Sequence, residues 1–434
     1  MSKHFYPVLA FLALTSVILA CVVQIPPVVP VPPTLSSGTA TPPFSPDDVG
    51  TAVALTLTAA VSGPAEGSAT APSTAATAAG STPTTGTGGA SLPHTLYYLA
   101  PDNAGITQVF RMETDGTTQR QVTSESVSIN DYDVSLVDGS VAYVANNQLL
   151  YINADGSERR LLVDGGAVDP NNPFISTISS PIFSLDGQTL AYGYKGLQIY
   201  SFSVDESELV VENQIDDAGG GLFVPQELYA PERYSPDGMK LLITLSYYEG
   251  ASSAVYYPAT NALVRLDGGE GALICCDDIE WSADSSSFYS ASSSAGMFSP
   301  GLWKVDAATG EVTTLIPGDA GGGNFNAAKE AYLGPDGQLY FFFGTVSSPE
   351  AMFNRAPLQL VRSAPDGVTG RSVLNSEDFQ LLNEALWAPD ASFVIAAIAS
   401  TPEVYQGGQA KVVYADGRPS IVLAPFAQQM KWGP

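Results

Sequence analysis

One sequence pattern recurs along most of this chain and constrains the fold more than any other feature. Its first half is an aromatic or apolar residue, a Ser-Pro-Asp-Gly turn or a variant of it, and an apolar run, as in Tyr234-Ser235-Pro236-Asp237-Gly238 before Leu241-Leu242-Ile243. The aspartates of the six complete first halves recur every 47 to 54 residues, at Asp138, Asp186, Asp237, Asp284, Asp336 and Asp390. A period of this length predicts a repeat architecture.

The second half of the pattern is an apolar run, an Asp-Gly turn and another apolar run. Asp-Gly turns favour tight connections because Gly accepts positive φ and Asp bonds the local backbone, and the flanking runs are rich in strand formers. Each repeat therefore predicts a four-stranded antiparallel sheet, the length of a propeller blade with its loops. Second halves occur near residues 109–122, 149–162, 197–211, 254–266, 302–316, 358–374 and 410–423.

The two halves of the pattern do not match in number, and the mismatch predicts a closed ring. Seven second halves accompany six complete first halves. The unpaired second half begins at Thr95, and the unpaired first half is the C-terminal segment Gln429–Pro434. A C-terminal strand that completes the N-terminal blade resolves the mismatch and leaves no open edge between the two. We predict an all-β fold, a seven-bladed β-propeller closed by the C-terminal strand, with six blades as the alternative.

The Ser-Pro-Asp-Gly first halves and the segment Val109–Gly116 resemble the TolB-type, WD-like propeller repeats of bacterial periplasmic and surface proteins. The resemblance covers residues 95–434 and implies a β-propeller. It does not extend to the separate amino-terminal domain of TolB, because this chain has low-complexity sequence there. The resemblance therefore implies the fold and not the Tol–Pal role.

The first 21 residues are typical of a targeting segment. Lys3 precedes a largely apolar run from Phe5 to Ala20, which is short for a membrane span and typical of a secretory signal. Ile18-Leu19-Ala20-Cys21 resembles a bacterial lipobox, which implies cleavage before Cys21 and lipidation of its thiol. An ordinary signal peptide or an uncleaved anchor are the alternatives. We expect an extracytoplasmic lipoprotein anchored to a cell membrane, at the bacterial surface or in the periplasm.

Residues 22–93 predict a disordered tether, since the segment is rich in Pro, Thr, Ala and Ser and has almost no charge. A short helix is possible at residues 46–62, where Ser45 can cap the helix and Val49, Val53 and Leu57 recur every four residues. The folded domain, residues 94–434, is expected to begin at His94.

The charge of the chain limits its partners. Its 44 acidic and 17 basic residues leave a formal net charge of −27, which argues against nucleic acid because phosphate binding requires clustered Lys and Arg. The Asp-Gly turns lack the spaced carboxylates of a calcium loop, so we predict no metal site and no cofactor.

Catalytic motifs are scarce. His94 is the lone histidine of the predicted domain, and no Gly-x-Ser-x-Gly motif occurs. An enzymatic mechanism would therefore have to rely on carboxylates alone. Cys275 and Cys276 are adjacent and could form a vicinal disulfide in an oxidising compartment, or simply occupy a loop or strand. A carboxylate-dependent hydrolase acting in the central funnel stays as the alternative function, and a purely structural spacer as a weaker one.

Three long inter-blade loops break the repeat, at Val168–Ile178, Asp216–Pro231 and Thr345–Pro357. Function concentrates on loops held by a rigid scaffold, so we predict a binding or scaffolding module for a protein or glycan. By contrast, the shared repeat position of Trp281, Trp387 and Trp432 predicts blade packing. The candidate binding-loop residues are Phe174, Phe223, Tyr229 and Phe353.

Overall fold

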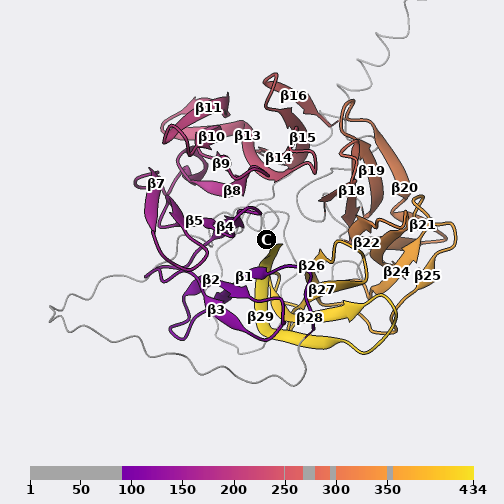
Figure 1. Cartoon of the computed structure of the whole chain (residues 1–434). Helices are drawn as coiled ribbons and strands as arrows, with labels where there is room; N and C mark the ends of the chain where they lie inside the picture. The colour runs from indigo at the N-terminus through magenta and orange to yellow at the C-terminus, as the bar shows by residue number, and fades with distance from the viewer. Residues whose placement is uncertain (1–89, 249, 267–278, 294–299, 349–354) are drawn as a thin grey trace, which may run out of the picture. The chain divides into compact units, whose positions relative to one another are not determined.

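The computed structural model describes residues 90–248, 250–266, 279–293, 300–348 and 355–434. Within these ranges the chain consists of antiparallel strands and one short 3-10 helix, η1 (Pro173–Ile175). Figure 1 shows the sheets arranged around a central axis, with the last strand lying beside the first. The prediction of an all-β propeller is confirmed.

Five of the sheets contain strands that are consecutive in sequence. The first two are β4 to β7 (Asp131–Val134, Val141–Ala145, Gln148–Ile152, Arg160–Asp164) and β8 to β11 (Ser179–Phe183, Thr189–Gly193, Gly196–Ser201, Glu206–Glu212). The next two are β12 to β16 (Gln214–Gly219, Leu222–Tyr234, Leu241–Tyr247, Gly250–Tyr257, Ala262–Arg265) and β17 to β20 (Ile279–Trp281, Ser287–Ser292, Gly301–Asp306, Val312–Ile316). The fifth is β21 to β25 (Asp319–Gly321, Asn324–Leu333, Leu339–Val346, Gln359–Ser363, Ser372–Val373).

The sixth sheet joins the two ends of the folded chain. Its order is β26-β27-β28-β29-β1-β2-β3. Its C-terminal members are β26 (Leu382–Trp387), β27 (Phe393–Ile398), β28 (Gly408–Tyr414) and β29 (Ile421–Trp432), and its N-terminal members are β1 (Leu96–Pro101), β2 (Thr107–Met112) and β3 (Gln119–Gln121).

Strand β29 closes the ring. Its first part pairs with β28, with Ala424 opposite Ala410, and its last part pairs with β1, with Trp432 opposite Leu96. The Gly433 amide donates to the Thr95 carbonyl at 2.8 Å just beyond the strand. The predicted closure by the C-terminal strand is confirmed.

The number of units in the described part depends on how β29 is counted. By continuous hydrogen bonding there are six sheets, and the largest has seven strands. If β29 is assigned both to β26–β28 and to β1–β3, that sheet divides into two four-stranded units and the ring has seven. The extra strands β12 and β21 form hairpins with the extended starts of β13 and β22, so they add to the loops and not to the ring.

The turn aspartates bond the local backbone, as predicted from the repeat. Asp284 accepts hydrogen bonds from the Ser282 hydroxyl at 2.7 Å and from the Ser286 amide at 3.0 Å. These hydrogen bonds lower the pKa of the Asp284 carboxyl to about 2. Amides two residues further along are bonded in the same way by Asp115, Asp155, Asp186, Asp237, Asp336, Asp366 and Asp390.

The aromatic residues that precede these turns pack between neighbouring units. Trp281 and Trp387 are buried, which confirms their predicted packing role. The Trp387 indole donates to the Glu330 carbonyl at 2.9 Å, and the partly buried Trp432 indole donates to the Trp387 carbonyl at 2.8 Å. Each of these indoles therefore ties one innermost strand to the preceding one.

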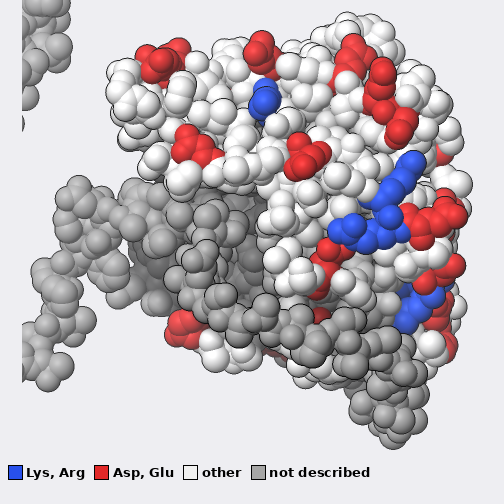
Figure 2. Space-filling view, turned by 90° about the vertical axis from the view of Figure 1, so that its left-hand side faces the viewer, with Lys and Arg blue, Asp and Glu red and all other residues white. Residues whose placement is uncertain are grey.

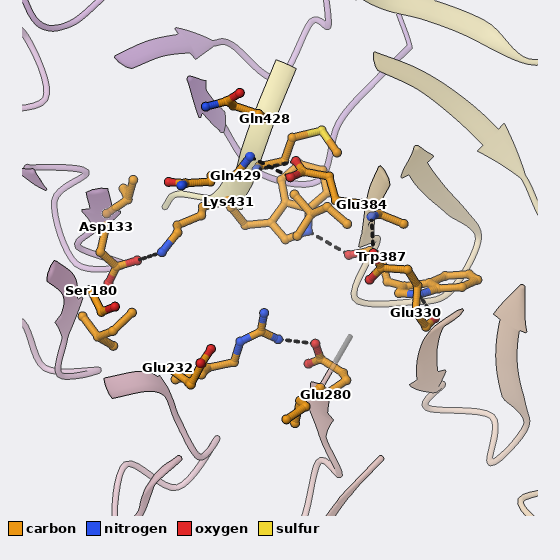
Figure 3. A pocket seen from close by; sticks show the side chains of 18 of the residues that line it. Asp133, Ser180, Glu232, Glu280, Glu330, Glu384, Trp387, Gln428, Gln429 and Lys431 are labelled. Carbon is orange, nitrogen blue, oxygen red and sulfur yellow. Dashed lines mark hydrogen bonds and ion pairs between the residues drawn. The ribbon is translucent and has the colours of Figure 1, made fainter. Parts of the chain in front are cut away.

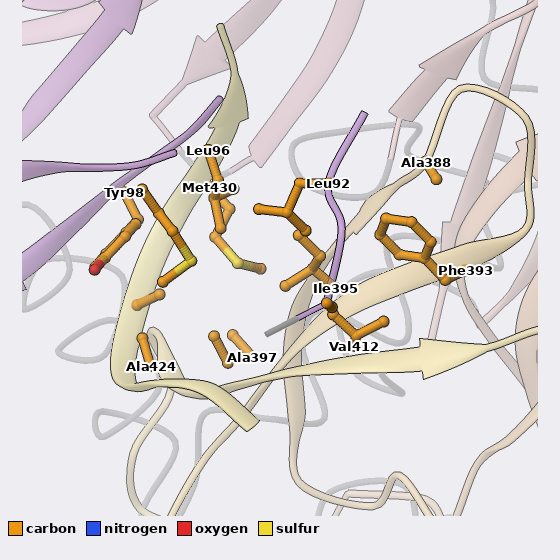
Figure 4. Packing of buried hydrophobic residues seen from close by; sticks show 14 of the residues in the cluster. Leu92, Leu96, Tyr98, Ala388, Phe393, Ile395, Ala397, Val412, Ala424 and Met430 are labelled. Atoms are coloured by element: carbon orange, nitrogen blue, oxygen red, sulfur yellow. The ribbon is translucent and has the colours of Figure 1, made fainter. Parts of the chain in front are cut away.

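The packed chain begins before the predicted start at His94. Ala90 and Leu92 are buried in one hydrophobic cluster with Ile395 and Val412, and Figure 4 shows Leu92 among the side chains of this cluster. The Leu92 amide donates to the Thr114 carbonyl at 2.9 Å.

Three predicted features lie outside the described residues. They are the signal segment with Cys21, residues 22–89 of the tether, and the helix 46–62. No helix in the described ranges has the length and apolarity required to cross a bilayer.

Gly116 provides a test of this N-terminal packing, with Gly105 as a matched control. Both have positive φ, 65° and 79°. A Cβ on Gly116 would lie 2.1 Å from the Ala90 carbonyl oxygen, whereas one on Gly105 would meet nothing within 4 Å. Gly105→Ala is expected to lower the free energy of unfolding by about 1 kcal/mol through the left-handed backbone alone, and Gly116→Ala by about 2–4 kcal/mol. Urea unfolding of both variants measures the difference, and equal losses would show that residues 90–92 do not pack as described.

Candidate binding site in the central channel

A cavity of about 960 Å³ runs along the axis of the ring. It is lined by residues of the innermost strands, which are the last part of β29 and β4, β8, β13, β17, β22 and β26. Figure 3 shows these strands contributing side chains from several sides to one space. The described lining therefore comes from most units of the ring.

The described lining of this channel is predominantly acidic. It includes six carboxylates and two basic side chains, so its formal charge is negative. The carboxylates belong to Asp131, Asp133, Glu232, Glu280, Glu330 and Glu384, and the basic groups to Arg233 and Lys431.

Three of these carboxylates bond the backbone of the next innermost strand. Asp131 accepts from the Ser180 amide at 2.6 Å, and Glu330 accepts from the Ala385 amide at 2.9 Å. Glu384 accepts from the Gln429 amide at 2.8 Å and from the Met430 amide at 3.0 Å. Asp131, Glu330 and Glu384 occupy one repeat position, three residues before the aromatic or apolar residue that ends each innermost strand. The carboxylates therefore link neighbouring units.

The same repeat position carries an unusual backbone conformation. Ser180, Glu330 and Gln429 have φ values of 52°, 54° and 50°, and the strand pairing shifts register at each of them. A left-handed conformation costs about 1–2 kcal/mol for a residue other than Gly. In Ser180 and Gln429 the bulge presents the amide that the preceding carboxylate binds, and that hydrogen bond offsets part of the strain.

Ion pairs form a second layer, two residues further along the innermost strands. The Lys431 ammonium lies 2.8 Å from one Asp133 oxygen, and the other accepts from the Phe183 amide at 2.7 Å. Arg233 pairs with Glu280 across neighbouring strands. Figure 3 shows Lys431, Asp133 and Glu280 pointing into the channel, and Arg233 also lines it. Both basic groups of the lining are therefore neutralised by carboxylates, and the excess charge of the channel stays negative.

Asp131 has an unusual electrostatic environment. Burial raises the pKa of its carboxyl, while the positive charge of Lys431 and hydrogen bonds from the Ser180 and Tyr132 amides lower it, and the pKa stays above its ordinary value. Asp131 and Asp133 both line the channel and lie two residues apart on β4, so two acidic groups are neighbours there.

The loop between β27 and β28 forms one mouth of the channel. Tyr405, Gln406 and Gly407 line it, and the Asn383 amide group donates to the Val404 carbonyl at 3.1 Å and to the Gly407 carbonyl at 2.5 Å. The Tyr405 side chain is 73% exposed. These bonds hold the loop against the ring. The sequence carries no signal for this segment, because a single tyrosine in a short polar loop does not belong to the repeat.

The predicted long loops leave the same end of the ring as this mouth. In an antiparallel four-stranded unit, the connection between its second and third strands and the connection to the next unit leave from one end. Two of the loops are joined directly, because the buried Asn172 side chain donates to the Gly221 carbonyl at 3.1 Å and accepts from the Phe223 amide at 3.4 Å. Phe174 and Phe223 are partly buried. We call this end the loop-side mouth.

Tyr229, one of the predicted binding-loop residues, does not lie in a loop. It belongs to the long strand β13 and is only 3% exposed, so its predicted placement in a binding loop is wrong. Its hydroxyl donates to Glu227 at 2.5 Å, and Glu227 pairs with Arg265. Burial and this hydrogen bond raise the pKa of Tyr229 to about 12. The alternation of the extended strand turns the ring into the core, which the loop-like composition of the segment did not reveal.

Three other predicted residues lie outside the described residues: Phe353 and the adjacent pair Cys275 and Cys276. His94 is exposed beside the closing strand, with its ring centroid 6.3 Å from that of Trp432. In the described ranges, no three His, Cys, Asp or Glu side chains are grouped to hold a metal ion.

Comparison with known proteins supports the fold. No family model and no curated protein matches the chain. A prolyl endopeptidase structure is 14% identical with a TM-score of 0.50, and the match covers 81% of this chain but only 50% of that one. TolB from Acinetobacter baumannii is 16% identical with a TM-score of 0.39, covering 75% of this chain and 77% of that one. A putative TolB from Agrobacterium tumefaciens is 14% identical with a TM-score of 0.40, covering 79% and 99%. At such identities the similarity extends to the fold alone.

The Lys431–Asp133 pair can be tested with a double-mutant cycle. Lys431→Met leaves a partly buried carboxylate without its cation, and is expected to lower the free energy of unfolding by about 1–3 kcal/mol. Asp133→Asn keeps an acceptor for the Phe183 amide, so the double variant should lose less than the sum of the single losses. Urea unfolding measures all three variants. Lys304→Met, at an exposed position without an ion pair among the described residues, is the control, and strictly additive losses would show that the pair contributes nothing.

Proposed function

We propose that this chain is an extracytoplasmic, membrane-anchored binding module whose protein or glycan ligand enters the central channel from the loop-side mouth. The observation that carries the proposal is the channel itself, a space of about 960 Å³ inside a closed ring. Ligand sites are typically concave, largely preformed and lined by a few oriented polar groups.

The rigidity of the lining supports binding. Asp131, Glu330 and Glu384 accept hydrogen bonds from backbone amides, and both basic groups of the lining are held in ion pairs. Side chains fixed in this way lose little conformational entropy when a ligand arrives. The same bonds occupy the carboxylate oxygens that a general acid or base would need free.

A carboxylate-dependent hydrolase is the second candidate. Asp131 and Asp133 are two residues apart on β4 and both line the channel, a separation of about 6–7 Å along a strand that falls within the range used by glycosidases. Burial raises the pKa of Asp131, as a general acid requires. This candidate is weaker because Asp133 is engaged by Lys431 and by the Phe183 amide.

The location and the class of partner rest on sequence and charge. The lipobox resemblance at Cys21 supports membrane anchoring through lipid, and the net charge of −27 disfavours nucleic acid. On the side drawn in Figure 2, the basic side chains lie next to acidic ones and do not form an uninterrupted basic surface. Protein or glycan is therefore the supported class of partner.

Binding through the channel can be tested with the full-length chain immobilised in detergent. We expect envelope extracts or glycan arrays to provide a specific ligand, and Gln428→Trp, which narrows the loop-side mouth, to reduce retention about tenfold. Val422→Trp is the matched control, because Val422 lies on the same strand, is 53% exposed and does not line the channel.

Equal retention by both tryptophan variants, or no retained ligand at all, would contradict the proposal. Turnover of a retained glycan that disappears in Asp131→Asn would favour the hydrolase instead.

Membrane anchoring can be tested by labelling cells with radioactive palmitate. Cys21→Ser is expected to abolish labelling and to release the protein from the membrane fraction, because each buried acyl methylene contributes about 0.8 kcal/mol to anchoring. The variant lacking both Cys275 and Cys276 should keep the label. Label that persists in Cys21→Ser would refute lipidation at this residue.

A further inference from the structure

The loop-side mouth presents an aromatic ring on a fixed loop. Tyr405 is 73% exposed and lines the channel. The Arg355 guanidinium lies 5.0 Å from the centroid of the ring and also donates to the Val404 carbonyl, while Asn383 holds the carbonyls on both sides of the Tyr405–Gln406 pair. The exposed ring is therefore oriented before any ligand arrives.

Three side-chain amides line the same channel as this ring. Gln406, Gln428 and Gln429 line the cavity together with Tyr405. The side-chain nitrogen (Nε2) of Gln429 donates to the Asn130 carbonyl at 3.1 Å. The buried side-chain oxygen (Oε1) of Gln429 has no hydrogen-bond partner in the described structure. A buried acceptor without a partner is costly unless a ligand or solvent donates to it. Gln429 is also one of the residues with a positive φ, and such strain concentrates at functional sites.

These groups match the chemistry of a sugar. A carboxamide both donates and accepts hydrogen bonds, as does a sugar hydroxyl. A tyrosine ring offers a large, rigid contact surface at low entropic cost, which suits the flat C–H face of a pyranose. The carboxylates of the channel outnumber its basic groups, so an anionic sugar would be repelled.

We propose that the loop-side mouth binds an uncharged oligosaccharide, with Tyr405 packed against a sugar ring and Gln406, Gln428 and Gln429 bonded to its hydroxyls. The proposal rests on the binding function proposed above and specifies its ligand. It selects a glycan over a protein because the lining offers an aromatic ring and separate side-chain amides and not an extended apolar surface.

Isothermal titration of the full-length chain in detergent can test the inference with defined hexasaccharides. The uncharged probes are cellohexaose, maltohexaose, xylohexaose, mannohexaose and N-acetylchitohexaose, and the charged probe is hexagalacturonate. At least one uncharged probe is expected to bind more tightly than hexagalacturonate. Tyr405→Ala should weaken that binding about tenfold, and Tyr405→Phe should keep most of it, because stacking does not require the hydroxyl.

Two controls separate loss of contact from loss of structure. Tyr248→Ala removes another exposed tyrosine, 66% exposed and outside the channel lining, and is expected to leave binding unchanged. Gln428→Ala should weaken binding with the same midpoint of urea unfolding as the unsubstituted chain.

The outcomes distinguish this inference from the broader function. Binding that is insensitive to Tyr405→Ala, tighter binding of hexagalacturonate than of every uncharged probe, or no binding of any uncharged probe would overturn the inference. If a protein is then retained in a manner that Gln428→Trp disrupts, the binding function stands and its ligand is a protein. If neither saccharide nor protein is retained, both proposals fail.

Discussion

The pairing of β29 with β1 is the interaction on which the rest of the structure depends. It joins residues more than three hundred positions apart in sequence, with Trp432 opposite Leu96 and Gly433 bonded to Thr95. Without it, β1 would leave an unpaired edge open to other chains. It also places Gln429 and Lys431 in the channel, so the same strand completes both the ring and the lining of the site.

Negative charge inside the ring is organised by backbone hydrogen bonds. Three carboxylates at one repeat position reach across to the next innermost strand and bind amides there. This arrangement satisfies buried donors that the bulges would otherwise leave unpaired, and it ties neighbouring units around the axis. The channel is acidic as a consequence, which disfavours anionic ligands whatever else the site recognises.

Much of the scaffold was predictable because it rests on local chemistry that each repeat carries. The turn aspartates bond nearby amides, and Trp281 and Trp387 are buried, as the shared register implied. The channel carboxylates were not among the predicted site residues. Aligning the repeats on the residue before each turn places Asp131, Glu330 and Glu384 in one column, and this shared position was the sequence signal that could have predicted them. Tyr229 was misjudged because its segment has the composition of a loop but extends a strand.

The sequence by itself determined the repeat, the turns, the strands and the pairing of the two chain ends, because these depend on residue type and spacing. Tertiary structure decided which side chains meet in the channel, since residues from separate units converge there only after the ring closes. It also decided that Ala90 and Leu92 are packed and that Tyr405 is presented at the mouth. Neither feature has a local signature, because burial and exposure depend on neighbours that are distant along the chain.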